Sequence, residues 1–87
     1  MYTIIRKNTS FVRFDFGPFY AKIRRSKFFE EFHYSIHLRY KSIELKSTNI
    51  FSEIVDSISL LCQFYNLEKL DREKLETDMK LLELDLE

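Results

Sequence analysis

A stretch of alternating apolar and polar residues, from Phe11 to Leu45, most constrains what this chain can fold into. Successive side chains of a β-strand point to opposite faces of a sheet, so a period of two predicts strands with one dry and one wet face. The alternating segments are 10–16, 19–25 and 33–41. Gly17-Pro18 predicts a tight hairpin turn between the first two. The phase of the alternation slips near Lys41-Ser42, which predicts a bulge or a break there.

A short run of β-branched residues at 2–6 predicts one further strand at the start of the chain. Near Ser47 the hydrophobic period changes from two to about 3.6, which predicts that helix follows the sheet. The segment 50–65 carries one apolar stripe, made of Phe51, Ile54, Val55, Ile58, Leu61, Cys62 and Tyr65. The helix is expected to start at a cap among residues 47–49 and to end at Asn66.

The remaining segment is rich in both leucine and charge, and it predicts a second helix from about 68 to 80. Residues 81–87 fit either the end of that helix or an acidic edge strand. The chain of 87 residues is therefore predicted to be one α+β domain. Its expected fold is an antiparallel β-sheet of three to four strands, followed by one or two C-terminal helices packed on one face.

Charge divides this single domain into two regions, although the formal net charge is zero. Residues 1–46 form a basic β-sheet region with ten Lys or Arg and four Asp or Glu, a net charge of +6. Residues 47–87 form an acidic helical region with four Lys or Arg and ten Asp or Glu, a net charge of −6. This asymmetry indicates either a polyanion-binding surface beside an acidic tail, or two faces that attract each other within one fold.

No catalytic constellation is present in the sequence. A single glycine excludes a Gly-rich phosphate loop and a nucleophile elbow. His33 and His37 share a strand face but lack further metal ligands, and Cys62 lies in the apolar stripe, where thiols are usually inert. We therefore expect a protein that is not an enzyme and that needs no metal or cofactor.

The expected location is cytoplasmic. One cysteine cannot form an intramolecular disulfide, which argues against a stapled secreted scaffold. No apolar run approaches the roughly 20 residues that a membrane span requires, so no membrane contact is expected. The start, MYTIIRKN, has no apolar signal core.

Basic and aromatic side chains are expected together on the wet face of the sheet. Single-stranded nucleic acid binds to such a mixture, because cations follow its phosphates and flat rings stack on its bases. The candidate nucleic-acid-binding residues are Arg13, Tyr20, Lys22, Arg24, Arg25, Lys27, Arg39 and Lys41.

Two stretches resemble the transcriptional positive-coactivator family. The stretch KSIELKSTNIFSEIVDSI, residues 41–58, resembles that family's last strand, polar cap and helix, and FVRFDFGPFYAKIR, residues 11–24, resembles its first hairpin. The resemblance implies a dimeric single-stranded-DNA binder built on a β-β-β-β-α unit. The positions that match the family's basic strand positions are Lys22, Arg24, Arg39 and Lys41. The family's Gly-rich basic turn has no counterpart in residues 26–35.

The alternative belongs to another class: a small phage- or virus-encoded inhibitor, similar to anti-CRISPR proteins, that binds and blocks a host or defence protein in the host cytoplasm. An acidic helix would then occupy the partner's nucleic-acid groove. The candidate partner-binding residues are Glu73, Leu75, Glu76, Met79, Leu82 and Glu83. A homodimer is left open for both alternatives, since a second copy would add to so small a core.

Overall fold

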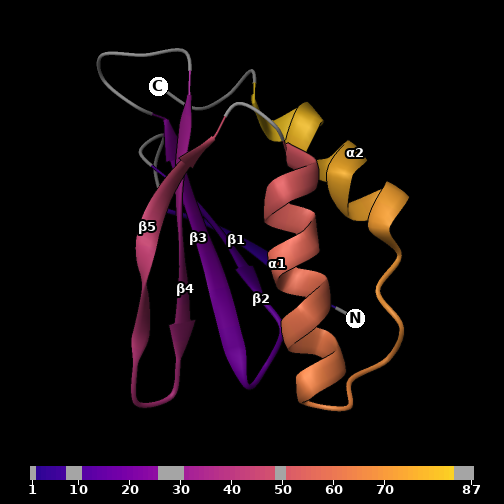
Figure 1. Ribbon diagram of the computed structural model, residues 1–87. Helices are drawn as coiled ribbons and strands as arrows, with labels where there is room; N and C mark the ends of the chain where they lie inside the picture. The colour runs from indigo at the N-terminus through magenta and orange to yellow at the C-terminus, as the bar shows by residue number, and fades with distance from the viewer. Residues whose placement is uncertain (1, 8–10, 26–30, 49–50, 84–87) are drawn as a thin grey trace.

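The computed structural model describes residues 2–7, 11–25, 31–48 and 51–83. Five strands form one antiparallel sheet in which each strand pairs with the next along the chain (Figure 1). The strands are β1 (Thr3–Lys7), β2 (Phe11–Asp15), β3 (Phe19–Arg25), β4 (Phe32–Leu38) and β5 (Ser42–Thr48). Two helices follow, α1 (Phe51–Phe64) and α2 (Arg72–Glu83), and both lie on the same side of the sheet. The predicted α+β class and the order of its elements are confirmed.

The sheet has one strand more than the three to four expected, because the segment 33–45 divides into two strands. β4 ends at Leu38, β5 begins at Ser42, and the Leu38 N–H donates to the Lys41 carbonyl at 2.8 Å. The expected break near Lys41-Ser42 is therefore a hairpin turn. The chain thus has one strand and one helix more than the β-β-β-β-α unit that the resemblance implied.

The hairpin between β2 and β3 forms at Gly17-Pro18, as predicted. Gly17 has a φ of 93°, a conformation that residues with a Cβ adopt only with strain. The Gly17 N–H donates to Asp15 Oδ1 at 2.9 Å, and the Phe16 N–H donates to the Phe19 carbonyl at 3.0 Å. These contacts fix the register of the two strands, so Arg13 lies opposite Lys22.

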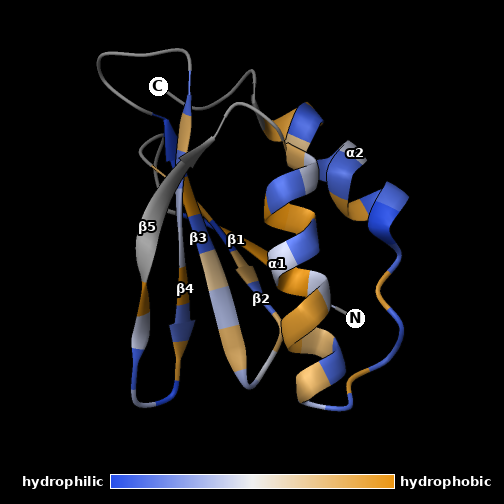
Figure 2. Cartoon of the chain, in the orientation of Figure 1, coloured by the Kyte–Doolittle hydropathy of each residue, from blue (hydrophilic) through white to orange (hydrophobic). Residues whose placement is uncertain are grey.

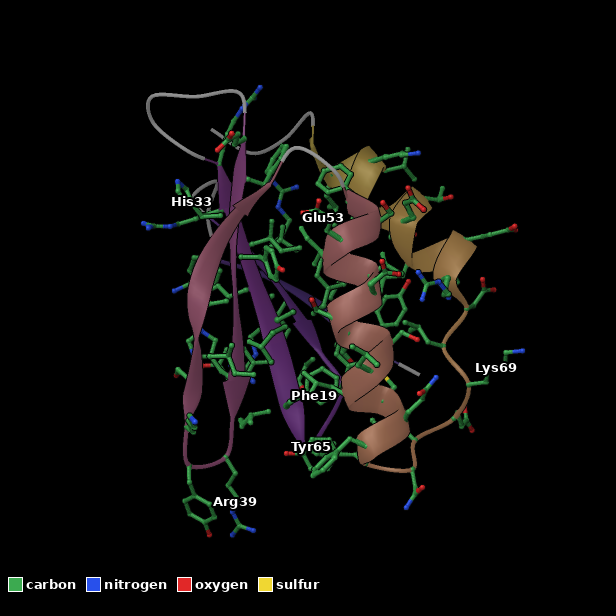
Figure 3. The ribbon with its side chains drawn as sticks, in the orientation of Figure 1. Phe19, His33, Arg39, Glu53, Tyr65 and Lys69 are labelled. Atoms are coloured by element: carbon green, nitrogen blue, oxygen red, sulfur yellow. The ribbon has the colours of Figure 1, made fainter. Side chains whose placement is uncertain are left out.

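The face of the sheet beneath the helices is dry. α1 alternates between apolar and polar bands (Figure 2) and turns its apolar stripe towards the strands, with Ile54 and Ile58 fully buried. Phe19 points towards Tyr65 of the chain that leaves α1 (Figure 3), with ring centroids 5.9 Å apart. Each large apolar side chain buried here contributes about 1.5–3 kcal/mol.

α1 ends at a Schellman motif. Asn66 has a φ of 54°, its N–H donates to the Gln63 carbonyl at 3.1 Å, and the Leu67 N–H donates to the Cys62 carbonyl at 2.9 Å. The predicted C-cap is thus confirmed. At the other end, Ser47 and Thr48 belong to β5 and therefore do not cap the helix, and Asn49 lies outside the described residues.

α2 begins four residues later than expected, because Asp71 is its N-cap: Asp71 Oδ1 accepts the Lys74 N–H at 3.1 Å. Leu75 and Met79 of α2 join the core, and Tyr2 donates a hydrogen bond to the Asp78 carboxylate. Burial and this hydrogen bond raise the pKa of Tyr2 above its usual value. The acidic helix therefore packs on the dry face and not on the basic face, so the alternative in which the two charged faces attract each other within one fold is not found.

A pair of leucines in α2 tests whether this helix belongs to the cooperative core. Leu75 is 0% exposed and Leu81 is 67% exposed. Leu75→Ala should lower the free energy of unfolding by about 2–5 kcal/mol, because it leaves a cavity. Leu81→Ala is the matched control and should change it little. Urea unfolding followed by circular dichroism measures both; equal, small losses would show that α2 is not held on the sheet.

Candidate functional site

The side of the sheet away from the helices, here called the open face, carries charged and planar side chains. In Figure 3, His33 of β4 points to this side, whereas Phe19 of β3 points to the helices. The strand pairing assigns to the open face Thr3, Ile5, Phe11, Arg13, Asp15, Tyr20, Lys22, Arg24, His33, Ser35, His37 and Ser42. None of the described helices lies on it.

Three planar groups on adjacent strands form a stack, here called the ladder: Arg13 of β2, Tyr20 of β3 and His37 of β4. The Arg13 Cζ lies 3.7 Å from the centroid of the Tyr20 ring. The His37 ring stacks on Tyr20 with centroids 4.6 Å apart and an interplanar angle of 10°. Since β2 and β4 flank β3, Arg13 and His37 occupy opposite faces of the phenol ring.

The His37 ring is held by two hydroxyl groups. Its Nε2 lies 2.8 Å from Ser35 Oγ, and its Nδ1 lies 2.9 Å from Ser42 Oγ. Burial, followed by the positive charges of Lys22 and Arg13, holds the pKa of His37 below its usual value. The imidazole is therefore neutral near pH 7, and its orientation is fixed by partners on β4 and β5.

Arg13 is partly neutralised within the face. Its Nη2 lies 2.5 Å from Asp15 Oδ2. The hydrogen bond from the Gly17 N–H, followed by that from Arg13, lowers the pKa of Asp15. Arg13 therefore serves mainly to build the ladder, and the charge that the open face offers to a ligand comes from other residues.

Lys22 and Arg24 supply that charge. They are two residues apart on β3, so both project from the open face. Lys22 Nζ lies 4.2 Å from the centroid of the Phe11 ring, and Arg24 is exposed. Together with Ser35 and His37 they line a depression of about 240 Å³. This is a cationic, hydroxyl-bearing hollow of the kind that suits an anionic group.

A second, larger depression lies beside the first and shares His37 with it. Its volume is about 540 Å³, and its lining includes Arg13, Pro18, Tyr20 and Arg39. Arg39 lies at the tip of the turn between β4 and β5 (Figure 3). The two depressions join the centre of the open face to this end of the sheet.

The structure brings together only part of the predicted nucleic-acid-binding set. Arg13, Tyr20, Lys22 and Arg24 share the open face. Arg25 does not: it pairs with Phe32, and its Cζ lies 5.9 Å from that ring, so it belongs to the dry side of β3. Arg25 has an odd number in β3, like the buried Phe19 and Ile23, so the alternation in the sequence already indicated the dry side.

Arg39 and Lys41 are exposed in the turn that follows β4, and the prediction that they continue a strand is wrong. Lys27 lies outside the described residues. Tyr40, which is not among the predicted residues, lies in the same turn. It is 88% exposed, and Arg39 Cζ lies 5.2 Å from its ring centroid. An aromatic residue between two basic residues was the available signal.

The candidate partner-binding residues of α2 are divided between core and surface. Leu75 and Met79 are buried and Leu82 is partly buried against the core, so they do not form an exposed anchor. Glu73 is exposed, Glu76 forms an ion pair with Lys80 at 3.6 Å, and Glu83 ends the helix.

The basic and acidic regions each form ion pairs of their own. The Arg13–Asp15 pair lies within the sheet region, and the pairs Lys80–Glu76 and Arg72–Asp56 lie within the helical region. With α2 on the dry face, its acidic residues do not cover Lys22 or Arg24. Within the described ranges, the helices therefore leave the positive charge of the open face accessible to a ligand.

Other chemistry finds little support in the part of the chain that the structure describes. Within it, no group of three or more His, Cys, Asp or Glu could hold a metal ion. The Cys62 thiol is buried, and burial raises its pKa. Nor does any helix among the residues described here have the length and apolar character that crossing a membrane requires.

The environment of His37 predicts a measurable pH dependence. Lys22→Met removes a nearby positive charge while keeping an apolar stem on Phe11, so the pKa of His37 should rise towards about 6.5. Lys69→Met, on the segment between the helices, is the control and should leave it unchanged. Imidazole proton shifts in an NMR titration report the value; an unchanged pKa in Lys22→Met would contradict the proximity of the two groups.

The same shift links pH to stability. The lowered pKa means that the unfolded chain binds more protons at His37 than the folded chain does. The contribution of this group to the free energy of unfolding is therefore complete above about pH 6.5 and declines as the pH falls below it. His37→Gln should reduce that decline, as measured by urea unfolding at pH 7 and pH 5.

Comparison of the chain with protein-family models, with curated proteins and with solved structures finds no match in any of the three. What the protein binds is therefore inferred from the residues of the open face.

Proposed function

We propose that the protein binds single-stranded nucleic acid across the open face of its sheet, as a module without catalytic activity. The observation that carries this proposal is the combination, on one face, of a ladder of planar groups with Lys22 and Arg24, two cations that form no ion pair with a carboxylate among the described residues. Cations that follow the phosphates and planar groups that stack with bases are the two features that single-strand binding surfaces combine. Both helices lie on the other side and leave the face accessible.

Charge favours a polyanionic ligand. Among the side chains that the structure describes on β2 and β3, the open face carries the cations Arg13, Lys22 and Arg24 and the carboxylate Asp15, which pairs with Arg13. Arg39, which lines the second depression, and the exposed Lys41 extend the positive charge to the end of the sheet. A strand that enters by this turn and crosses β3 would meet cations along its whole path.

Salt dependence tests this proposal. Changing both Lys22 and Arg24 to Ala should weaken binding of a single-stranded oligonucleotide. It should also reduce the slope of log affinity against log salt by about 1.4, since each phosphate contact on a single strand contributes about 0.7. Fluorescence anisotropy between 50 and 200 mM salt measures both quantities.

The matched control changes Lys69 and Lys80, which removes the same charge from the helical side of the molecule. Its affinity and slope should stay close to those of the unchanged protein, because charges farther apart than about 10 Å are screened at 0.1 M salt. Equal losses in the two double variants would show that net charge, and not the open face, governs binding.

A second candidate, binding to and blocking a protein partner, is favoured by one observation on α1. Leu60 and Phe64 are 67% and 76% exposed, and their spacing of four places them on one face of the helix. Leu60 and Phe64 offer a protein partner an exposed apolar contact. Leu75 and Met79 cannot offer one, because they are buried. Absence of any single-strand binding at low salt would favour this second function.

A further inference from the structure

We propose that one nucleobase of the bound strand stacks on the imidazole of His37, above Ser42, as a fourth layer of the ladder. This inference rests on the proposed function and deepens it, because it names the part of the ligand that is recognised. Stacking on a base, and not only pairing with phosphates, would make the protein select single strands over duplexes.

The order of the strands shows which end of the ladder is free to accept a ligand. Tyr20 pairs with His37, and His37 pairs with Ser42, so these three residues lie side by side on β3, β4 and β5. The ring separation of 4.6 Å is close to the spacing of about 4.7–4.9 Å between neighbouring strands. Strands β2, β3 and β4 therefore each contribute one planar group to the ladder. Ser42 of β5 occupies the next position across the sheet.

Among the side chains that the structure describes, Ser42 is the one at that position, and it leaves the position open. It is exposed, and its hydroxyl lies 2.9 Å from Nδ1, the ring nitrogen nearer the backbone of His37. A serine is too short to cover the imidazole face that points away from Tyr20. The opposite end of the ladder differs, because Ile5 of β1 pairs with Arg13 and puts a branched apolar side chain beside it. The end of the ladder at β5 is therefore the one that can accept a flat ligand.

Tyr20, the predicted stacking residue, does not itself offer a surface to a base. Arg13 and His37 occupy its two faces at 3.7 and 4.6 Å. The role passes to His37, whose ring is oriented by Ser35 and Ser42 before any ligand arrives. A ring that is already fixed loses little conformational freedom when a base stacks on it.

The surroundings suit a nucleotide unit in particular. Arg39 and Lys41 flank the turn that leads into Ser42, and both are exposed. A base above Ser42 would have its phosphates near these cations or near the Lys22 and Arg24 hollow, which His37 also lines. The position above Ser42 on the face of His37 is here called the seat. In a duplex both faces of each base are covered by its neighbours, so no base can stack in the seat.

The test compares two single strands of equal length and charge: oligothymidylate, and an abasic strand with the same sugar–phosphate backbone. The unchanged protein should bind oligothymidylate about tenfold more tightly, a difference of about 1.4 kcal/mol, within the range for one stacked base. Ser42→Phe fills the seat with the chain's own ring and should reduce the preference to about one. His37→Ala removes the platform and should do the same, whereas both variants keep the salt slope.

His33→Ala is the matched control, since it removes an imidazole four residues away on the same face of β4 and should keep the tenfold preference. The NMR signals of His37 provide a second readout that needs no variant: its ring protons should shift upfield when oligothymidylate binds, and not when the abasic strand binds.

The outcomes separate the two proposals. If no single strand binds at low salt, both the proposed function and the base seat are overturned. If both strands bind equally and binding depends on Lys22 and Arg24, the face binds phosphates and the seat is overturned. If the preference for thymine bases persists in Ser42→Phe and His37→Ala, single-strand binding stands and the base stacks elsewhere.

Discussion

Burial of one face of the sheet beneath α1 is the interaction on which the rest of the structure depends. Ile54 and Ile58 are fully buried against strands whose inward side chains alternate with polar ones. α2 completes the same layer through Leu75 and Met79. Because both helices are used on this side, every residue at the alternate strand positions is left on the open face. The layout of charge and rings follows from that division.

The open face is organised by contacts across strands. Arg13 pairs with Asp15 and stacks on Tyr20, so a cation that sequence alone would count as free is tied into the ladder. Lys22 and Arg24 remain to attract an anion. The sheet itself separates them from the acidic helix, since α2 packs on the other side. The positive charges of Lys22 and Arg24 are thereby kept on a surface that a ligand can reach.

Particular residues show how far prediction from the sequence reaches. The Gly17-Pro18 hairpin, the apolar stripe of α1 and the Asn66 cap are local features, because they depend on neighbours within a few residues. The alternation continues through Arg39 and Lys41 and therefore predicts a strand at these residues, although the chain turns there. The alternation of apolar and polar residues indicates which face each side chain occupies, but it does not indicate where the backbone turns.

The sequence by itself determined the α+β class, the dry and wet faces of β2 and β3, and the position of the hairpin turn between them at Gly17-Pro18. Only the tertiary structure decided that Tyr20 lies opposite His37 and that Ser42 is the next position across the sheet. The Tyr20–His37 pairing joins strands across the longer connection between β3 and β4, where turn chemistry does not fix the register. The His37–Ser42 pairing crosses a short turn at Arg39-Tyr40, which carries no Gly, Pro, Asn or Asp to mark the register in the sequence. The packing of α1 and α2 on the dry face selects it, because a slip of one residue would turn the apolar side chains of β4 to the open face.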